Sequence, residues 1–580
     1  MPFRGIRVIT GLASLLLMTR KSLTPKGKQK ILVAGIFAAI FLTGVFMFAF
    51  TPIDVQKTYN QFVTTTDGVP ICFDVFEPAN NPATNKPAVI LGHGIMVNKE
   101  MMRLVALELA KNGFVAVPFD FRGHGQSGGD LELSMSGFGG MNGTTPPGLV
   151  NDILAIKQYL KGRGDINMTN LGYLGYSMGG GAGFELLSHD NDFNAMVGMA
   201  PMPDYSDTNV SNPRNLLIVI GGLDETNSMN SLWKVMANKT GLPASSLELG
   251  HLYGSFVSGT AAKMVVDPLT DHLTAPYDPN FVREIVNWYL QALQGVSTTP
   301  ADFAYPVLVA AAFIAMAGAL GLFWTASGPI LDRFARKKQE TPVSSAILGV
   351  TSNRNLVGRY LAYGLVLSVP CMFAGAFLLA TPLTFSAFFF MFLAGPSVAA
   401  LLMVWRTYAK QGIGFAQMYR TNVATTSGRN LLVGTALGVI LYALLLLSAN
   451  NLLGIVPSIF RWGWLPLYYV AIVFALINFM VFALPLVAEK FGRGRKFGIV
   501  IAAAINILLS TVIFGVMMVI VCLAMGSFFF IIILPPTFAI LFITFCTGTY
   551  YYLRTNDVIM PSMTAAIFWT LVIVTLSPFF

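Results

Sequence analysis

The chain has 580 residues, of which 54% are hydrophobic and only 11% are charged. Soluble domains carry about 25% charged residues, so this composition excludes a wholly soluble protein and places much of the chain in lipid. Residues 51–331 hold 14 Lys and Arg against 24 Asp and Glu, whereas residues 341–580 hold 12 against two. The positive excess therefore belongs to the apolar half, where it predicts membrane orientation and not nucleic-acid binding.

The four cysteines do not form a disulfide framework. Only Cys72 lies in the polar part of the chain, so no disulfide can link two segments there. No spacing typical of a metal site occurs either. We expect neither a metal nor a cofactor.

The first hydrophobic segment, residues 31–53, contains 23 residues without a charge. As a helix it spans about 30 Å of hydrocarbon, and it follows a basic stretch, residues 1–30. The positive-inside rule predicts that this stretch is cytoplasmic and that the chain after the segment lies outside. A cleaved signal peptide is the alternative, but its apolar core would be too long and no small-x-small cleavage site follows. We expect an uncleaved transmembrane anchor.

The second half, residues 303–580, is expected to form a polytopic helical domain of about eight spans, which gives nine with the anchor. The Pro535-Pro536 pair can kink or break the eighth span. Connections expected on the inside are rich in Lys and Arg, whereas those expected outside carry almost none, with Arg461 as the exception. After the first span of this half, which begins near Phe303, the expected spans are 356–380, 382–405, 431–453, 463–487, 498–525, 527–553 and 559–579.

This topology leaves one large extracytoplasmic region, residues 54–300. All four N-x-S/T sequons of the chain fall there, which agrees with an outside location. They begin at Asn142, Asn167, Asn209 and Asn238.

Apolar strand-like runs alternate with helical segments along this region. Residues 59–76 resemble two strands around an Asp67-Gly68 turn. Buried-strand runs then alternate with helical segments, which predicts a mostly parallel sheet covered by helices on both faces. The expected strand runs are 87–94, 114–121, 171–176, 193–200 and 215–222.

Ser177 follows one of these runs and precedes a plausible helix start. Ligands meet the carboxyl ends of the strands in such a sheet, and a sharp strand-to-helix turn would lift the hydroxyl out of it. Flanking glycines permit the strained backbone that this turn requires. Ser127 has the same G-x-S-x-G spacing but lies in a loop with no following helix. Ser177 is therefore the candidate nucleophile.

A serine nucleophile needs a base, and the base needs an orienting acid. Asp224 directly follows the strand run 215–222 and is the candidate acid. Two histidines can supply the base. His272 follows a better strand and precedes a helix that would close the domain, whereas His251 follows only a short apolar run. The sequence favours His272, and it gives His93 and His124, both in glycine turns, a structural role.

These segments together resemble an α/β-hydrolase of the monoacylglycerol-lipase and serine-aminopeptidase type, over about 57–295. The resemblance implies Ser177 as nucleophile, Asp224 as orienting acid and His272 as general base. It also implies an oxyanion hole made of the backbone N–H groups of Ile95 and Met178. The motifs are GHGIM at 92–96, DFRGHGQSGG at 120–129, GYSMGG at 175–180 and DHLTAP at 271–276.

One departure from the family concerns the cover of the site. Only residues 201–214 separate the two strands between which many relatives carry a helical cap, and this segment is too short for one. The site is then open, covered by the Met-rich loop 133–148, or covered by the membrane domain. The substrate class of the capped lipases therefore does not transfer to this chain.

The leading interpretation is a membrane-anchored serine hydrolase that cleaves an ester, thioester or peptide bond outside the cell membrane. Its partners would be a small-molecule, lipid or peptide substrate and membrane lipids, with no nucleic acid. The same triad can also transfer an acyl group to an acceptor other than water. The alternatives are a non-catalytic ligand-binding, sensor or transport-associated module with a hydrolase-like fold, and an exporter whose outside domain processes cargo.

Overall fold

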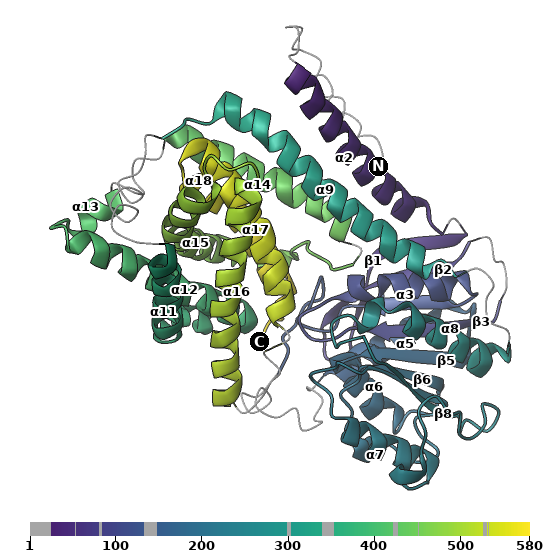
Figure 1. Cartoon of the computed structure of the whole chain (residues 1–580). Helices are drawn as coiled ribbons and strands as arrows, with labels where there is room; N and C mark the ends of the chain where they lie inside the picture. The colour runs from purple at the N-terminus through teal and green to yellow at the C-terminus, as the bar shows by residue number, and fades with distance from the viewer. Residues whose placement is uncertain are drawn as a thin grey trace.

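The computed structural model describes residues 25–52, 54–79, 84–132, 148–297, 303–338, 353–420, 427–450, 452–525, 531 and 533–580. The Met-rich loop 133–148 lies outside the described residues except for Gly148, as does the sequon at Asn142. An α/β domain lies beside a bundle of long helices, and the chain ends between the two (Figure 1). The α/β domain contains the predicted sheet.

The sheet has eight strands in the order β1-β2-β4-β3-β5-β6-β7-β8. β1 and β2 form the predicted antiparallel hairpin, β2 is also antiparallel to β4, and the remaining neighbours are parallel. The strands are β1 (Val55–Thr64), β2 (Pro70–Pro78), β3 (Lys86–Gly92), β4 (Val115–Phe119), β5 (Ile166–Tyr176), β6 (Phe193–Met199), β7 (Leu216–Gly221) and β8 (Ala262–Asp267).

Helices cover both faces of the sheet, as alternating strand residues show. On β5, Gly172 packs against Tyr289 of α8, whereas the next residue, Tyr173, packs against Gly183 of α6. Successive strand side chains point to opposite faces, so α8 and α6 lie on opposite sides. The helices of this domain are α3 (Lys99–Lys111), α5 (Leu149–Arg163), α6 (Met178–Leu187), α7 (Met229–Thr240) and α8 (Pro279–Gln294).

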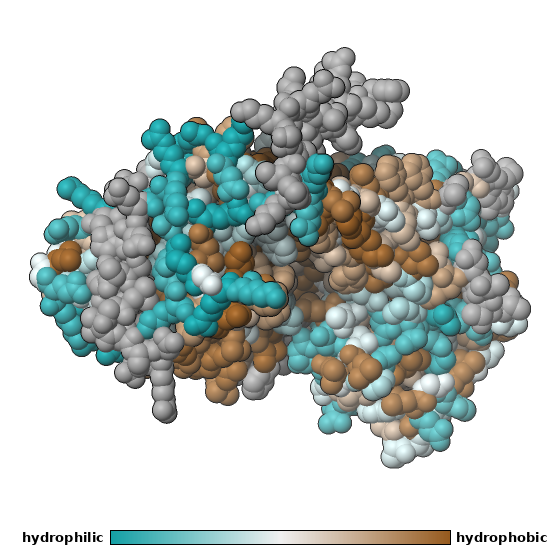
Figure 2. All heavy atoms as spheres, turned by 45° about the horizontal axis from the view of Figure 1, so that its top comes forward, coloured by the Kyte–Doolittle hydropathy of each residue, from teal (hydrophilic) through white to brown (hydrophobic). Residues whose placement is uncertain are grey.

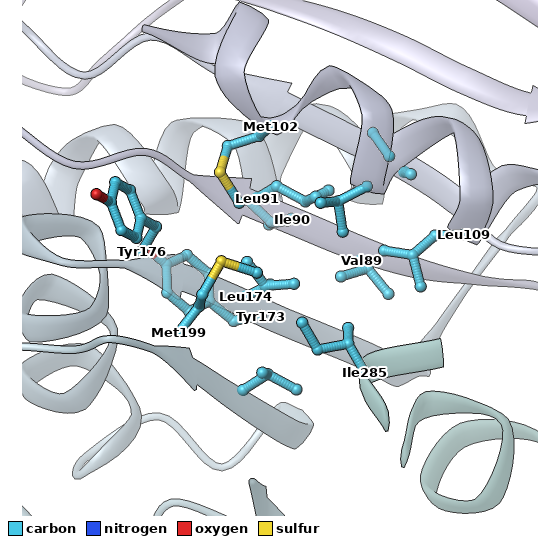
Figure 3. Packing of buried hydrophobic residues seen from close by; sticks show 14 of the residues in the cluster. Val89, Ile90, Leu91, Met102, Leu109, Tyr173, Leu174, Tyr176, Met199 and Ile285 are labelled. Carbon is cyan, nitrogen blue, oxygen red and sulfur yellow. The ribbon is translucent and has the colours of Figure 1, made fainter. Parts of the chain in front are cut away.

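The core of the domain lies between the sheet and these helices. Side chains from β3, β5 and β6 meet Met102 and Leu109 of α3 and Ile285 of α8 (Figure 3). The central strands are fully buried, with Val89, Ile90 and Leu91 each at 0% exposure. This burial explains why these strands appear in the sequence as uninterrupted apolar runs.

The predicted anchor is the helix α2 (Pro25–Phe50), which begins before the uncharged run and ends before Ile53. It lies along α9 (Tyr305–Phe334), where glycines allow the backbones to approach closely (Figure 1). A Cβ on Gly44 would lie 2.8 Å from Cα of Ala315, and one on Gly318 would lie 2.6 Å from Cα of Phe41. Close packing at small residues is typical of helix pairs in membranes.

The remaining helices form a bundle around a second apolar core. Each predicted span of residues 303–580 contains a helix among its described residues, and α11 continues as a 3-10 helix over Met372–Ala380. The helices are α11 (Asn353–Cys371), α12 (Thr384–Ala409), the short α13 (Phe415–Tyr419), α14 (Gly428–Ala449), α15 (Leu465–Val487), α16 (Gly498–Met525), α17 (Leu534–Thr555) and α18 (Ile559–Leu576).

Among the described residues, eight helices are long and apolar enough to cross a membrane, α2 included. The predicted eighth span, 527–553, corresponds to α17, a helix of 22 residues that is less apolar than these eight helices and is not among them. Pro535 and Pro536 lie at its start, where proline is tolerated because the first N–H groups have no helical partner. The proline pair therefore begins this helix and does not interrupt it.

Candidate active site

Ser177 lies in the turn between β5 and α6, as the sequence predicts. Its backbone has φ 51° and ψ −117°, a conformation that is strained for a residue with a side chain. Its N–H donates to the carbonyl of Met199 (3.1 Å), and its own carbonyl accepts from the N–H of Gly181 (3.1 Å). The surrounding fold therefore holds this strained turn, which directs the hydroxyl away from the sheet.

The start of α6 lies against the loop that follows β3. The N–H of Gly179 donates to the carbonyl of His93 (3.1 Å). A Cβ on Gly179 would lie 2.6 Å from that oxygen, and one on Gly94 would lie 3.1 Å from Cβ of Ser177. These two glycines allow the loop that carries Ile95 to approach the turn that carries Ser177 and Met178.

His272 lies in the loop after β8 and contacts both other candidate residues. Its Nε2 is 2.9 Å from Oγ of Ser177, and its Nδ1 is 2.8 Å from Oδ2 of Asp224. The side chains of His272 and Asp224 are each only 2% exposed. The structure thus brings together the three residues that the sequence selects, from the ends of β5, β7 and β8.

The hydrogen bonds around His272 determine which ring nitrogen carries the proton. The carboxylate of Asp224 can only accept, so Nδ1 of His272 is the donor in that contact. Nε2 is then free of a proton in the neutral ring and accepts from the hydroxyl of Ser177. This is the tautomer that a general base toward serine requires.

Two residues that the sequence did not indicate hold Asp224. Its Oδ1 accepts from the N–H and the hydroxyl of Thr226 (both 2.9 Å) and from the N–H of Asn227 (2.8 Å). Oγ1 of Thr226 is also 2.7 Å from Nδ1 of His272. Burial raises the pKa of the Asp224 carboxyl, but the bond from His272 and the two N–H groups outweigh it and lower that pKa below its usual value.

Tyr176, next to Ser177, supports the loop of His272. Its hydroxyl donates to the carbonyl of His272 (2.9 Å), and the two rings lie 5.3 Å apart. Tyr176 appears in the sequence only as the aromatic residue of G-x-S-x-G, so its contact with a loop 96 positions away has no sequence signal.

The other histidines lie apart from these contacts. His251 is exposed, with its ring against Tyr253. His93 and His124 are buried, and their rings lie 5.0 Å apart. Burial lowers the pKa of His93 to about 4 and that of His124 well below the usual range, so both are neutral at pH 7.

Ser127 has a structural role. Its hydroxyl donates to the carbonyl of Asp120 (2.7 Å) and accepts from the N–H of Cys72 (2.8 Å). Ser127 therefore joins the loop after β4 to β2 and lies in a loop, as the sequence indicates.

The comparisons with known proteins match part of this domain. The family described as serine aminopeptidase, S33, matches residues 83–247, which include Ser177 and Asp224. No curated protein matches the chain significantly.

Several solved structures are similar to part of the chain. An esterase from Pyrococcus furiosus is 19% identical, over 42% of this chain and 96% of that one, with a TM-score of 0.32. A hypothetical protein from Pseudomonas aeruginosa is 13% identical, over 41% and 94%, with a TM-score of 0.31. A cold-adapted esterase from an Arctic intertidal metagenomic library is 18% identical, over 42% and 95%, with a TM-score of 0.30.

The strand order, the strained serine turn and the family match thus concern the same domain. Residues 83–247 of this domain are therefore similar to the serine hydrolases of the serine aminopeptidase, S33, family.

Proposed function

We propose that the protein is a membrane-anchored serine hydrolase that acts through Ser177, His272 and Asp224 on the extracytoplasmic side. The observation that carries the proposal is the continuous set of hydrogen bonds from Ser177 through His272 to Asp224. The strained turn at Ser177 supports it, because backbone strain of this kind is concentrated at functional sites.

In the first half of the reaction, Oγ of Ser177 attacks the substrate carbonyl carbon and its proton moves to Nε2 of His272. Asp224 stabilises the imidazolium that forms, without taking the proton. The N–H groups of Ile95 and Met178 stabilise the negative oxygen of the tetrahedral intermediate, each by about 3 kcal/mol. His272 then protonates the leaving group, and an acyl-enzyme remains.

In the second half, His272 removes a proton from water, and the resulting hydroxide attacks the acyl-enzyme. The tetrahedral intermediate collapses when His272 returns the proton to Oγ of Ser177, which releases the carboxylic acid. The substrate is an ester, thioester or peptide. An acceptor alcohol or amine in place of water would give acyl transfer by the same steps.

Labelling with a fluorescent fluorophosphonate tests the proposal in the detergent-solubilised full chain. Wild type should be labelled, Ser177→Ala should not, and Ser211→Ala, a change at an exposed loop serine, should be labelled like wild type. Absence of label on folded wild-type protein would contradict the proposal and favour a ligand-binding module.

A further inference from the structure

Ser177 lies at the C-terminal ends of the parallel strands, and this side of the sheet faces the helical bundle. The loop 452–461, which follows α14, and the C-terminal residues 577–580 lie against it. The contacts are hydrogen bonds from Asn98 to Gly454 (2.9 Å), Gln126 to Val456 (2.8 Å), Tyr277 to Leu452 (2.7 Å), Leu131 to Phe579 (2.7 Å) and Phe579 to Gly123 (2.9 Å).

Arg461 lies at the centre of this interface and is fully buried. Its guanidinium donates to the carbonyls of Gly123 and Gly125 (both 2.7 Å) in the loop after β4. It also donates to Ser458 Oγ (2.9 Å) and the carbonyl of Ser577 (3.2 Å), and it lies 5.0 Å from the ring centre of Phe579. These acceptors are neutral, so burial of the cation is costly unless every bond is kept.

The loop that Arg461 holds leads directly to the candidate oxyanion hole. His124 lies between Gly123 and Gly125, and its ring packs on His93. The Nε2 of His93 accepts from the N–H of Phe121 (3.0 Å). The backbone carbonyl of His93 accepts from the N–H of Gly179 at the start of α6. Ile95, two residues after His93, packs against the core of the bundle itself.

We propose that the helical bundle is the cap of the hydrolase site and that Arg461 is a positioning residue for it. Through Gly123 and Gly125, Arg461 holds His124 and His93, and these hold the segment whose N–H group at Ile95 stabilises the oxyanion. This inference rests on the proposed hydrolase function. It explains how a domain without a helical cap of its own can close its site.

The test measures hydrolysis of a p-nitrophenyl ester and the rate of fluorophosphonate labelling in Arg461→Gln, Arg461→Lys and wild type. A displaced oxyanion segment should lower kcat roughly ten- to a hundredfold with little change in KM, and should slow labelling in parallel. Arg461→Lys keeps the charge and part of the bonding, so it should recover part of kcat. Arg429→Gln, at an exposed arginine far from the interface, is the matched control.

Phe579→Ala is a second variant in case Arg461→Gln does not fold. It removes the ring beside the guanidinium and leaves the backbone bonds of residue 579, so it should give a smaller decrease in kcat. Variants that fold and label at the wild-type rate would overturn the role of Arg461 and leave the hydrolase proposal intact. A wild type that neither labels nor turns over would instead contradict the hydrolase proposal.

A separate pocket lies at the other end of the bundle, between α2, α9, α16 and α17, with a volume of about 810 Å³. Its walls are largely apolar, with Val33, Trp324, Ile507 and Phe542 among them. On α16 the lining runs from Ile499 to Ile507, about 12 Å along the helix axis. The pocket is therefore long enough along the helix to take part of an acyl chain.

Cations gather where this pocket opens at the helix ends. Lys30 and Arg554 line it, and Arg554 pairs with Asp332 (2.5 Å). Exposed Lys28, Arg495 and Lys496 lie at the adjoining starts of α2 and α16. Hydrophilic side chains cover one end of the bundle, with hydrophobic side chains on its flank (Figure 2). Basic pockets between transmembrane helices on the cytoplasmic side bind anionic lipid headgroups.

We infer that this pocket binds one anionic phospholipid, with its acyl chain beside Trp324 and its headgroup at Lys30. Native mass spectrometry of the detergent-solubilised protein tests this with phosphatidylglycerol and phosphatidylcholine in equal amounts. Wild type should retain phosphatidylglycerol preferentially. Ala504→Trp, which fills the pocket from α16, should lose it, and Lys30→Gln should lose the preference. Lys410→Gln, at an exposed lysine outside the pocket, should behave as wild type. Equal retention of both lipids, or retention in Ala504→Trp, would overturn the inference.

Discussion

At the scale of single residues, the contacts of the side chains, and not the residue type, distinguish His272 from His251. His272→Ala should abolish turnover, by about a thousandfold or more, because the proton of Ser177 then has no acceptor. His251→Ala changes an exposed side chain and should stay within about twofold of wild type. Ester hydrolysis by both purified variants checks this, and loss of turnover in His251→Ala alone would move the base to that residue.

The buried histidines predict a loss of stability in mild acid. An unfolded chain binds protons on His93 and His124 below about pH 6.5, whereas the folded protein does not until about pH 4, where His93 titrates. Folding stability should therefore fall as the pH decreases through this window, by about 1.4 kcal/mol per pH unit for each histidine.

Thermal unfolding between pH 7 and pH 4.5 checks this. Burial and the neighbouring His93 lower the pKa of His124 most, and Arg461 adds to them, while the carbonyl of Arg122 and the charge of Asp120 oppose them. His124→Gln removes one of the two titrating groups, so its melting temperature should depend less on pH. An unchanged pH dependence in His124→Gln would show that other groups cause the acid sensitivity.

The sequence predicts Ser177, Asp224 and His272 because each follows an apolar strand at the same edge of a parallel sheet. It does not predict Thr226, Asn227 or Tyr176, because their roles depend on loops that meet only after folding. The sequence gives one indication for Arg461, because it is an isolated cation in a connection that is expected outside, where Lys and Arg are rare. Only the structure shows that this cation is buried against the hydrolase domain.

At the scale of elements, the contact of α6 with the loop after β3 depends on the absence of a side chain at Gly179. A Cβ there would lie 2.6 Å from the carbonyl oxygen of His93 and 2.8 Å from the carbonyl of Gly92, and backbone atoms cannot rotate away. Gly179→Ala should therefore destabilise the protein by about 1–3 kcal/mol and should lower fluorophosphonate labelling. Gly162→Ala, at an open helical position, is the matched control, and equal labelling in the two variants would contradict this prediction.

The helices of the second half show where sequence patterns are sufficient and where they are not. Length and hydropathy predict the long helices of this half, because a segment in lipid must satisfy its own backbone. They do not predict the short α13, which lies in an expected connection. They do not predict that Pro535 and Pro536 begin α17, because a proline pair looks the same at a helix start and at a break. The structure decides between the two, because the helix starts at Leu534, directly before the pair.

At the scale of the whole molecule, successive connections between the helices lie at alternate ends of the bundle. Arg429 donates to the carbonyl of Arg333, and Asn430 to that of Arg336. Arg493 and Lys338 both bond to the end of α17, at the C-cap Asn556 and at Thr555. The basic connections therefore share one end, and the loops that contact the hydrolase domain share the other.

This arrangement leads to a topology prediction. Because cations remain on the cytoplasmic side, the basic end should be inside and the hydrolase domain outside. A membrane-impermeant maleimide applied to intact cells should label an engineered Ser211→Cys but not Lys410→Cys, and both should be labelled once the membrane is permeabilised. Parallel labelling of the unsubstituted chain gives the background from the four native cysteines, of which Cys72 and Cys522 are buried. Labelling of Lys410→Cys alone in intact cells would indicate the opposite topology. The catalytic residues and their substrate would then lie in the cytoplasm.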